Sequence, residues 1–184
     1  MRDKLINVKN CLVTCLIITM FSGIAYAGPN SSATCGLDMN FSTTDIEADI
    51  AASAGDIITV AVVAGGVSNL DTYQAELVYD TTVLEFIEGY EEVPMSGIRN
   101  LLKTNRGTTL GFQAVEKEPG TVNIANTLTG TDTSEAPEGS GILAIIKFRV
   151  LEDDPGKISL ANVHFVDSSQ AQDIIRNTAG GNVN

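Results

Sequence analysis

Residues 67–86 read VSNLDTYQAELVYDTTVLEF. Apolar and polar side chains alternate through Thr72–Tyr79, which is the two-residue period of a β-strand with one buried face. The chain then turns at Tyr79-Asp80 and resumes with apolar residues. The segment therefore predicts two strands joined by a short turn. On the first strand, the inward residues are Tyr73, Ala75, Leu77 and Tyr79, and the outward residues are Gln74, Glu76 and Val78.

The same kind of short β-branched and apolar run recurs along the chain, separated by Gly, Pro and Asp turn signals. Many short strands at this spacing predict an all-β sandwich or barrel. We expect no long helix and one short helical turn, within 81–84 or 98–103. The expected strands are Asp45–Ala52, Ile57–Ala64, Thr72–Tyr79, Val83–Glu88, Thr109–Val115, Thr121–Leu128, Ile142–Leu151 and Lys157–Val166, with a last segment in Ala171–Arg176.

The expected strand Ile142–Leu151 is apolar on both faces at its start. Lys147 and Arg149 suit a solvated outer face, whereas Leu143 and Ile145 fall on that same face and do not. Two outward aliphatic residues indicate either a covering loop or an apolar patch exposed for a partner.

The first 27 residues have the pattern of a secretory signal peptide. A basic start is followed by the apolar run Cys11–Ile24 and the small-residue pattern Ala25-Tyr26-Ala27. A membrane anchor is the alternative, but a span needs roughly 20 apolar residues. A lipoprotein site at Cys15 would lie too early, inside the apolar run. We expect cleavage after Ala27, a secreted or periplasmic/extracellular location, and no membrane attachment afterwards.

The remaining chain is long enough for one domain with its own core. We expect a polar leader over 28–40, a sandwich over 41–176 and a flexible C-terminal tail over 177–184. Cys35 would be the single cysteine left, an idle thiol in the leader. The full chain has 11 basic and 23 acidic residues, a net charge of −12. This acidity argues against binding nucleic acid or an anionic membrane surface.

The sequence offers little to catalysis. It has one histidine, His164, within a predicted strand, and no G-x-S-x-G motif. The acid pairs Glu91-Glu92 and Asp153-Asp154 fall in predicted turns, where carboxylates are ordinarily solvated. No Cys/His cluster suggests zinc, and the acids of the 132–138 loop lack the spacing of a helix–loop–helix calcium site. We therefore predict no enzyme, no catalytic residue, no cofactor and no metal site.

Sugar binding is a competing hypothesis, because sandwich modules stack sugar rings on exposed aromatic side chains. The chain has no tryptophan. Tyr73 and Tyr79 alternate with the core residues, which leaves Tyr90 as the one exposed tyrosine expected in the mature chain.

A set of strand motifs runs along the chain from about residue 45 to 176. The motifs are Asn69 through Phe86, Gly55-Asp56-Ile57-Ile58-Thr59-Val60, Gly120-Thr121-Val122-Asn123-Ile124, Gly141-Ile142-Leu143-Ala144-Ile145-Ile146-Lys147-Phe148-Arg149-Val150, and Leu160-Ala161-Asn162-Val163 with Val166-Asp167. The ordered set resembles the cohesin family.

The resemblance implies a nine-stranded jelly-roll β-sandwich that binds dockerins, small calcium-loaded modules, in polysaccharide-degrading assemblies. It implies one binding face, built partly from 72–79, 121–128 and 142–150, with small aliphatic residues surrounded by amides, as in protein interfaces. The implied partner-binding residues are Gln74, Glu76, Val78, Asn123, Ala125, Thr127, Leu143 and Ile145. The fold is shared with carbohydrate-binding modules, so a polysaccharide ligand stays open, as does a surface or assembly subunit that binds its own kind.

Overall fold

The computed structural model describes residues 28–43, 45–93, 97–130 and 133–184. These residues form twelve strands and two short 3-10 turns, η2 (Leu101–Lys103) and η3 (Thr133–Glu135). The strands are β1 (Thr34–Asp38), β2 (Asp49–Ile50), β3 (Ile57–Val67), β4 (Leu70–Tyr79), β5 (Leu84–Tyr90), β6 (Gln113–Glu118), β7 (Thr121–Thr127), β8 (Gly139–Val150), β9 (Gly156–Asp167), β10 (Gln172–Ile174), β11 (Asn177–Ala179) and β12 (Gly181–Val183).

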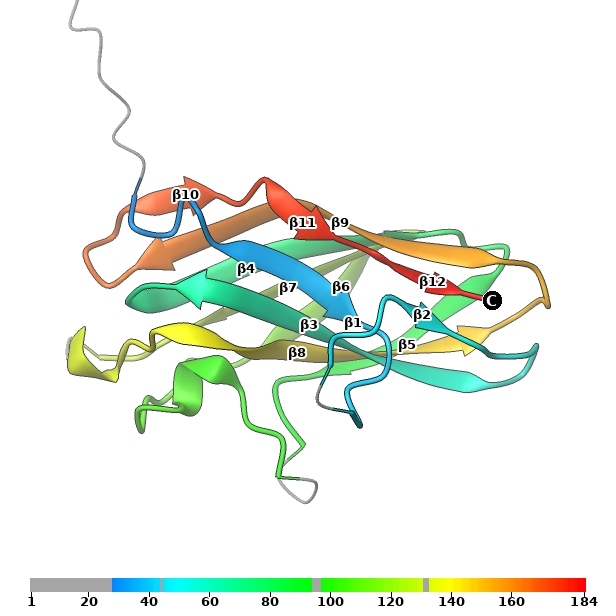
Figure 1. Cartoon of the computed structure of the whole chain (residues 1–184), viewed down its shortest axis with the longest axis horizontal. Coiled ribbons are helices and arrows are strands. Elements are labelled where there is room, and N and C mark those ends of the chain that lie inside the picture. Colours follow the sequence, from blue (N-terminus) through cyan, green and yellow to red (C-terminus); the bar gives the residue numbers. More distant parts are fainter. Residues whose placement is uncertain (1–27, 44, 94–96, 131–132) are drawn as a thin grey trace, which may run out of the picture.

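The strands form two sheets packed face to face (Figure 1). Sheet A has the order β11-β1-β3-β8-β5, and sheet B has the order β2-β12-β9-β4-β7-β6, with β10 pairing with β9. The long neighbours are antiparallel, as in β3–β8 and β4–β9, while β1 runs parallel to the short β11. The predicted all-β sandwich is confirmed. The predicted count of nine strands is approximate, since four of the twelve described strands have only two or three residues.

The core lies between the sheets and follows the alternation read from β4. Tyr73, Ala75 and Leu77 are buried, as predicted. Phe148 of β8 meets the ring of Tyr79 edge-on with 5.0 Å between centroids, so the two sheets interlock across an aromatic contact. The expected helical turn lies at η2, within the second of the two predicted positions.

The strand β8 contains a β-bulge that the sequence pattern did not reveal. Ala144 pairs with Val62 and Ile142 pairs with Val63, so Leu143 is an extra residue without a partner on β3. The bulge shifts the alternation by one residue and turns Leu143 into the core, where it is fully buried. The main-chain oxygen of Leu143 instead accepts hydrogen bonds from the Tyr73 hydroxyl and the Asn100 amide.

The predicted polar leader over 28–40 is wrong for its second half. The strand β1 (34–38) pairs with β3 in sheet A, and Leu37 and Met39 are fully buried. Cys35 is buried too, and burial raises the pKa of its thiol to about 12. The sequence analysis missed this strand because its alternation, of small residues with Cys35 and Leu37, is short and follows residues rich in Ser and Asn.

The C-terminal residues also differ from the expected flexible tail. The strand β12 lies between β9 and β2, and Val183 is 1% exposed. A side chain at Gly181 would force Met39 to move, because an added Cβ would lie 2.2 Å from the Met39 sulfur. The end of the chain therefore packs against the end of β1, and both expected boundaries of the sandwich, 41 and 176, lie too far inward.

No helix in the described parts of the chain is long and apolar enough to cross a bilayer. The predicted signal peptide, residues 1–27, lies outside the described residues.

Candidate functional site

The outer face of sheet B is an open surface centred on β4. Gln74, Glu76 and Val78 point away from the core between two long neighbouring strands. On β7, these residues lie opposite Ala125, Asn123 and Thr121, and Thr127 lies opposite Thr72. On β9, they lie opposite His164, Ala161 and Ser159. On β6, Gln113 and Val115 continue the rows of Ala125 and Asn123.

Small and aliphatic side chains occupy much of this face. Val78 is 40% exposed and Val115 is 56% exposed. Ile174 on β10, opposite His164, is 56% exposed. Leu110, next to the end of β7, is 77% exposed and borders a shallow hollow of about 180 Å³ with Gly111 and Thr127. Exposed aliphatic residues gathered over neighbouring strands are typical of an interaction surface.

The charges near the centre of the face neutralise each other. The Lys117 ammonium lies 3.6 Å from a carboxylate oxygen of Glu76, and the Asn162 amide donates a hydrogen bond to the other Glu76 oxygen. The Asn123 side-chain oxygen is buried and accepts no hydrogen bond in the described part of the structure. A buried acceptor without a donor is costly where it stands.

A second bulge shapes the β9 side of the face. Gln74 pairs with His164 and Glu76 pairs with Ala161, so β9 has one more residue than β4 in this interval. Asn162 takes the positive φ of 45° at the bulge, which asparagine tolerates better than most residues. The bulge thereby projects the exposed Asn162 amide toward Glu76 on the outer face.

The outer face of sheet A has a different chemistry. Arg149 pairs with Glu85 at 2.6 Å, and Lys147 pairs with Glu88 at 3.3 Å. The Lys147 ammonium also lies 4.8 Å above the Tyr90 ring and donates to its hydroxyl. Tyr90 is thus covered by a charged side chain and does not offer a bare ring on which a sugar could stack.

The eight residues predicted for the binding face divide by sheet. Six lie together on the outer face of sheet B: Gln74, Glu76, Val78, Asn123, Ala125 and Thr127. The placement of Leu143 and Ile145 on that face is wrong, because β8 belongs to sheet A and both residues are buried. Ile145 lies opposite Ala61 and Tyr90 within sheet A. Apolar character on both faces of β8 therefore reflected burial rather than an exposed patch.

Sequence reasoning missed the contributions of β6 and β9 to this face. Val115 was assigned to a strand expected to begin at 109, and nothing in the local pattern placed that strand at the edge of sheet B. The mixed alternation around Ala161 and Asn162 was the available signal of a bulge on β9, since two small or polar residues interrupt the apolar period.

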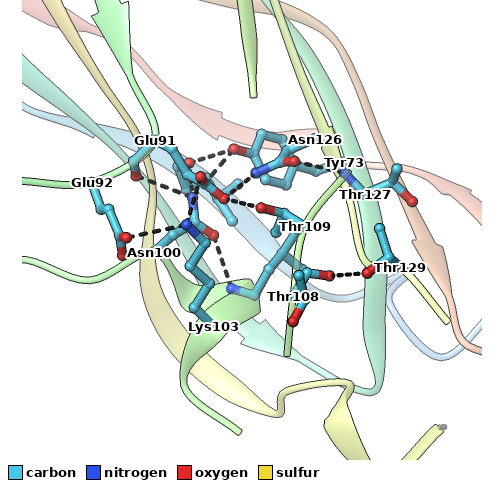
Figure 2. Close-up of polar contacts among 12 residues, drawn as sticks. Tyr73, Glu91, Glu92, Asn100, Lys103, Thr108, Thr109, Asn126, Thr127 and Thr129 are labelled. Carbon is cyan, nitrogen blue, oxygen red and sulfur yellow. Dashed lines mark hydrogen bonds and ion pairs between the residues drawn. The ribbon is translucent and has the colours of Figure 1, made fainter. Parts of the chain in front are cut away.

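A polar cluster holds the β5–β6 connector against one end of this sheet (Figure 2). The Glu91 carboxylate accepts hydrogen bonds from the Thr109 hydroxyl at 2.6 Å and the Asn126 amide at 2.7 Å. Its other oxygen lies 2.7 Å from the Lys103 ammonium, which also pairs with Glu92 at 3.1 Å. The connector is therefore attached to β7 at the position where Leu110 borders the outer face.

The same cluster reaches the bulge on β8 through Asn100. Its amide donates to the main-chain oxygens of Glu91 and Leu143, and its side-chain oxygen accepts from the Leu102 N–H at the start of η2. Asn100 is fully buried. One side chain thus links sheet A, the connector and the aromatic hydroxyl of Tyr73, as the dashed contacts of Figure 2 show.

The electrostatics of the cluster stabilise charged Glu91. Burial acts to raise the pKa of Glu91, but hydrogen bonds from Lys103, Thr109 and Asn126 outweigh it, so the pKa lies below its ordinary value. Burial acts to lower the pKa of Lys103, and the two glutamates raise it above its ordinary value. The expectation that Glu91 is a solvated turn residue was therefore wrong, because the connector folds over it.

No group of three or more His, Cys, Asp or Glu side chains that could hold a metal ion occurs in the described residues. His164 lies on the outer face of sheet B with its Nδ1 2.6 Å from the Gln172 amide nitrogen. The Asp132–Glu138 loop lies partly outside the described residues. The arrangement offers complementary contact on a sheet face rather than a group poised for bond breaking.

Comparisons with known proteins point to one family. The family model of the Cohesin domain matches residues 43–184. No curated protein sequence matches the chain. A type II cohesin domain from the cellulosome of Acetivibrio cellulolyticus superposes with a TM-score of 0.62 at 18% identity, covering 83% of this chain and 95% of that one.

Two further solved structures share the fold. A type I cohesin–dockerin complex from Clostridium thermocellum gives a TM-score of 0.61 at 13% identity, over 82% of this chain and 91% of that one. A non-cellulosomal cohesin from the archaeon Archaeoglobus fulgidus gives 0.56 at 17% identity, over 82% and 88%. At these identities the likeness concerns the fold alone.

Proposed function

Since the chain belongs to the cohesin domain family, whose members are non-catalytic binding domains, we propose that it is an exported module that docks a dockerin-type protein on the outer face of sheet B. The family assignment agrees with the prediction that the chain is not an enzyme. Docking would use shape and hydrogen-bond complementarity and no bond chemistry.

The observation that carries this proposal is the composition of the outer face of sheet B. Val78 and Val115 provide exposed aliphatic area, and amides and hydroxyls surround them. The Glu76–Lys117 pair leaves no unbalanced charge at the centre. An apolar centre with a polar rim is the usual anatomy of a protein interface. The sheet A face, with its exposed ion pairs, lacks this arrangement.

The proposed contact residues extend the predicted set. Gln74, Glu76, Asn123 and Thr127 would form the polar contacts, and Val78 and Ala125 would pack against the partner. We add Val115 and Asn162 from the flanking strands, because the register places both beside this central group. A dockerin-type partner is supported by the family and by solved complexes such as the one from Clostridium thermocellum.

Export is the second part of the proposal, and it rests on the sequence. Basic residues, an apolar run and Ala25-Tyr26-Ala27 form the three parts of a signal peptide. The mature chain would carry 8 basic and 22 acidic residues. Such a chain suits an extracellular or periplasmic adaptor whose partner carries bound calcium.

The experiment is a capture assay with residues 28–184 as bait and the exported proteins of the source organism as prey, in calcium and in chelator. Capture of a dockerin-bearing protein that is lost in chelator is the expected result. Val78→Asp should weaken binding of that purified dockerin at least 100-fold, about 3 kcal/mol. Ile57→Asp is the control, since Ile57, like Val78, is an exposed aliphatic residue (56% against 40%) but lies in sheet A.

Three results would contradict the proposal. Equal loss of binding in Ile57→Asp and Val78→Asp would mean that the outer face of sheet B is not the docking surface. Retention on cellulose or another glycan without protein capture would favour the carbohydrate-binding alternative. A concentration-dependent homo-oligomer lost in Val78→Asp would favour the assembly subunit.

A further inference from the structure

The short strand β10 carries a carboxylate that is buried against the first described residues of the chain. Asp173 is 5% exposed. Its Oδ1 accepts a hydrogen bond from the Gly28 nitrogen at 2.8 Å, and its Oδ2 accepts one from the Asn30 nitrogen at 2.8 Å. None of the ion pairs found in the described residues includes Asp173. A buried carboxylate without a cation is costly to keep charged.

The N-terminal turn is built to hold Gly28 at this carboxylate. Asn30 is fully buried, donates to the Ser68 oxygen at 3.1 Å and accepts from the Ser68 nitrogen at 2.7 Å. The Ser31 nitrogen closes the turn onto the Gly28 oxygen at 3.2 Å. Figure 1 shows this first blue segment beside β10. The contact is therefore part of the fold rather than a passing approach.

The glycine at position 28 allows the close approach of the Asp173 carboxylate. A Cβ added there would lie 2.5 Å from the Asp173 Oδ2 atom. Such a distance is too short for a real carbon atom, so any side chain would displace either the main chain or the carboxylate. The sequence thus combines a glycine, a buried acid and a fixed turn around one nitrogen atom.

That nitrogen is the atom which the predicted cleavage after Ala27 would release. Water adds across the Ala27–Gly28 amide in a peptidase, leaving a carboxylate on Ala27 and an amine on Gly28 that is protonated at neutral pH. We propose that Asp173 is a binding site for the α-ammonium group of Gly28, so that processing converts a neutral N–H contact into a buried ion pair and stabilises the mature fold.

The added stability of the mature fold comes from the positive charge of the ammonium group and from its larger number of hydrogen-bond donors. The uncleaved chain offers Asp173 one neutral N–H from Gly28, whereas the ammonium offers three donors and a full positive charge. The N–H contact with the carboxylate is already charge-assisted, and the ammonium adds the direct attraction between two opposite full charges at low solvent exposure. The proposal depends on the predicted cleavage site and is independent of the docking face.

The neighbouring titratable groups are engaged elsewhere. Asp167, at the end of β9, accepts from Ser169 and the Ala171 nitrogen. His164, on the strand beside β10, lies on the outer face against Gln172. The pH dependence of the new contact should therefore reflect the Gly28 amine. An ammonium beside a carboxylate has a raised pKa, so its stabilisation is present below about pH 8 and is lost as pH rises through the folded value.

The first test measures that amine directly. Mature protein that begins at Gly28, released from a fusion without extra residues, is labelled with ¹³C-glycine, and the Gly28 Cα shift is followed from pH 6 to 11. We expect a pKa above about 9, compared with about 8 for a free α-amino group. A value at or below about 8 would overturn the proposal.

The second test is a cycle of two changes. Acetylation of Gly28 keeps one N–H and removes the charge, and Asp173→Asn removes the acid. Acetylation should lower the urea midpoint at pH 6.5 in the wild type but not in Asp173→Asn, and the difference should vanish near pH 10.5. Equal effects of acetylation in both backgrounds would overturn the proposal. If Asp173→Asn does not fold, the amine titration decides.

A third measurement tests the cleavage itself. N-terminal sequencing of the protein exported by the source organism should begin at Gly28, and another first residue would contradict the proposal. Binding of the captured dockerin should be equal for the acetylated and free N-terminus. Failure of the ammonium site and failure of the docking face are therefore distinguishable.

Discussion

The two outer faces of the sandwich share the same strand geometry but carry different side chains. On sheet A, Lys147 and Arg149 extend into solvent and pair with glutamates of β5. On sheet B, the corresponding central positions hold Gln74, Val78 and a Glu76 that is balanced by Lys117. Sheet A also has exposed aliphatic residues, Ile57 at the first position of β3 and Leu151 just after β8.

This difference shows that the outer face of sheet B carries fewer exposed ion pairs than the outer face of sheet A. Exposed ion pairs add little stability, commonly 0–1 kcal/mol, but a partner must strip water from them before it can dock. The outer face of sheet B demands less of that desolvation. In a chain with a net charge of −12, a sheet face whose central acid, Glu76, is balanced by Lys117 is therefore a local departure that the bulk composition does not reveal.

The sharpest test of this comparison is the border between face and core at Leu143. Leu143→Ala should lower the free energy of unfolding by about 2–5 kcal/mol, because it leaves a cavity in a fully buried site. Val78→Ala, at a 40% exposed site, should cost about 0.5 kcal/mol or less. Urea unfolding measures both. Similar small effects of Leu143→Ala and Val78→Ala would mean that Leu143 is not a buried core residue.

A second prediction concerns the β5–β6 connector, which borders the outer face of sheet B. Asn100→Ala removes the donor to the Leu143 oxygen and the acceptor for the Leu102 N–H. We expect a loss of about 1–3 kcal/mol in the free energy of unfolding, since buried polar groups lose their partners.

The matched control for that variant is Asn105→Ala, at an exposed position in the same connector whose amide reaches the Ala136 oxygen only at 3.4 Å. Its effect should be near zero. Equal effects of the two substitutions in thermal or urea unfolding would show that the Asn100 contacts do not stabilise the connector.

Acid should weaken the Glu91 cluster. The folded pKa of Glu91 is depressed, so its contribution is present above the unfolded value, about 4.3, and is lost as pH falls through the folded one. Urea midpoints between pH 7 and 3 should therefore fall less steeply in Glu91→Gln than in the wild type. Glu138→Gln, at an exposed site, should keep the wild-type slope. Parallel slopes for all three proteins would contradict this role.

The smallest effect is expected on the charged face. A double-mutant cycle of Arg149→Ala and Glu85→Ala should give a coupling of about 0.2–1 kcal/mol, because both side chains are about half exposed. The coupling should shrink as salt is raised from 0.05 to 0.5 M. A larger, salt-independent value would mean that this face is a structural element in its own right.

The alternation of side chains was enough to predict the sandwich and most long strands. Residues 57–64, 72–79, 121–128 and 157–166 all contain strands close to the expected bounds. The same alternation assigned Gln74, Glu76 and Val78 to the outside of β4, and Asn123, Ala125 and Thr127 to the same side of β7. These assignments depend only on the two-residue period, which is local.

The two-residue period carries no information about which distant strands pair with each other. Only the tertiary structure decided that β8 belongs to sheet A, because strand order follows from contacts far apart in sequence. The bulge at Leu143 belongs to the same class, since an extra residue exists only relative to a partner strand. The terminal strands β1 and β12 were missed for this reason as well. Each is too short to show a period, and each pairs with a strand near the other end of the chain, β1 with β11 and β12 with β2.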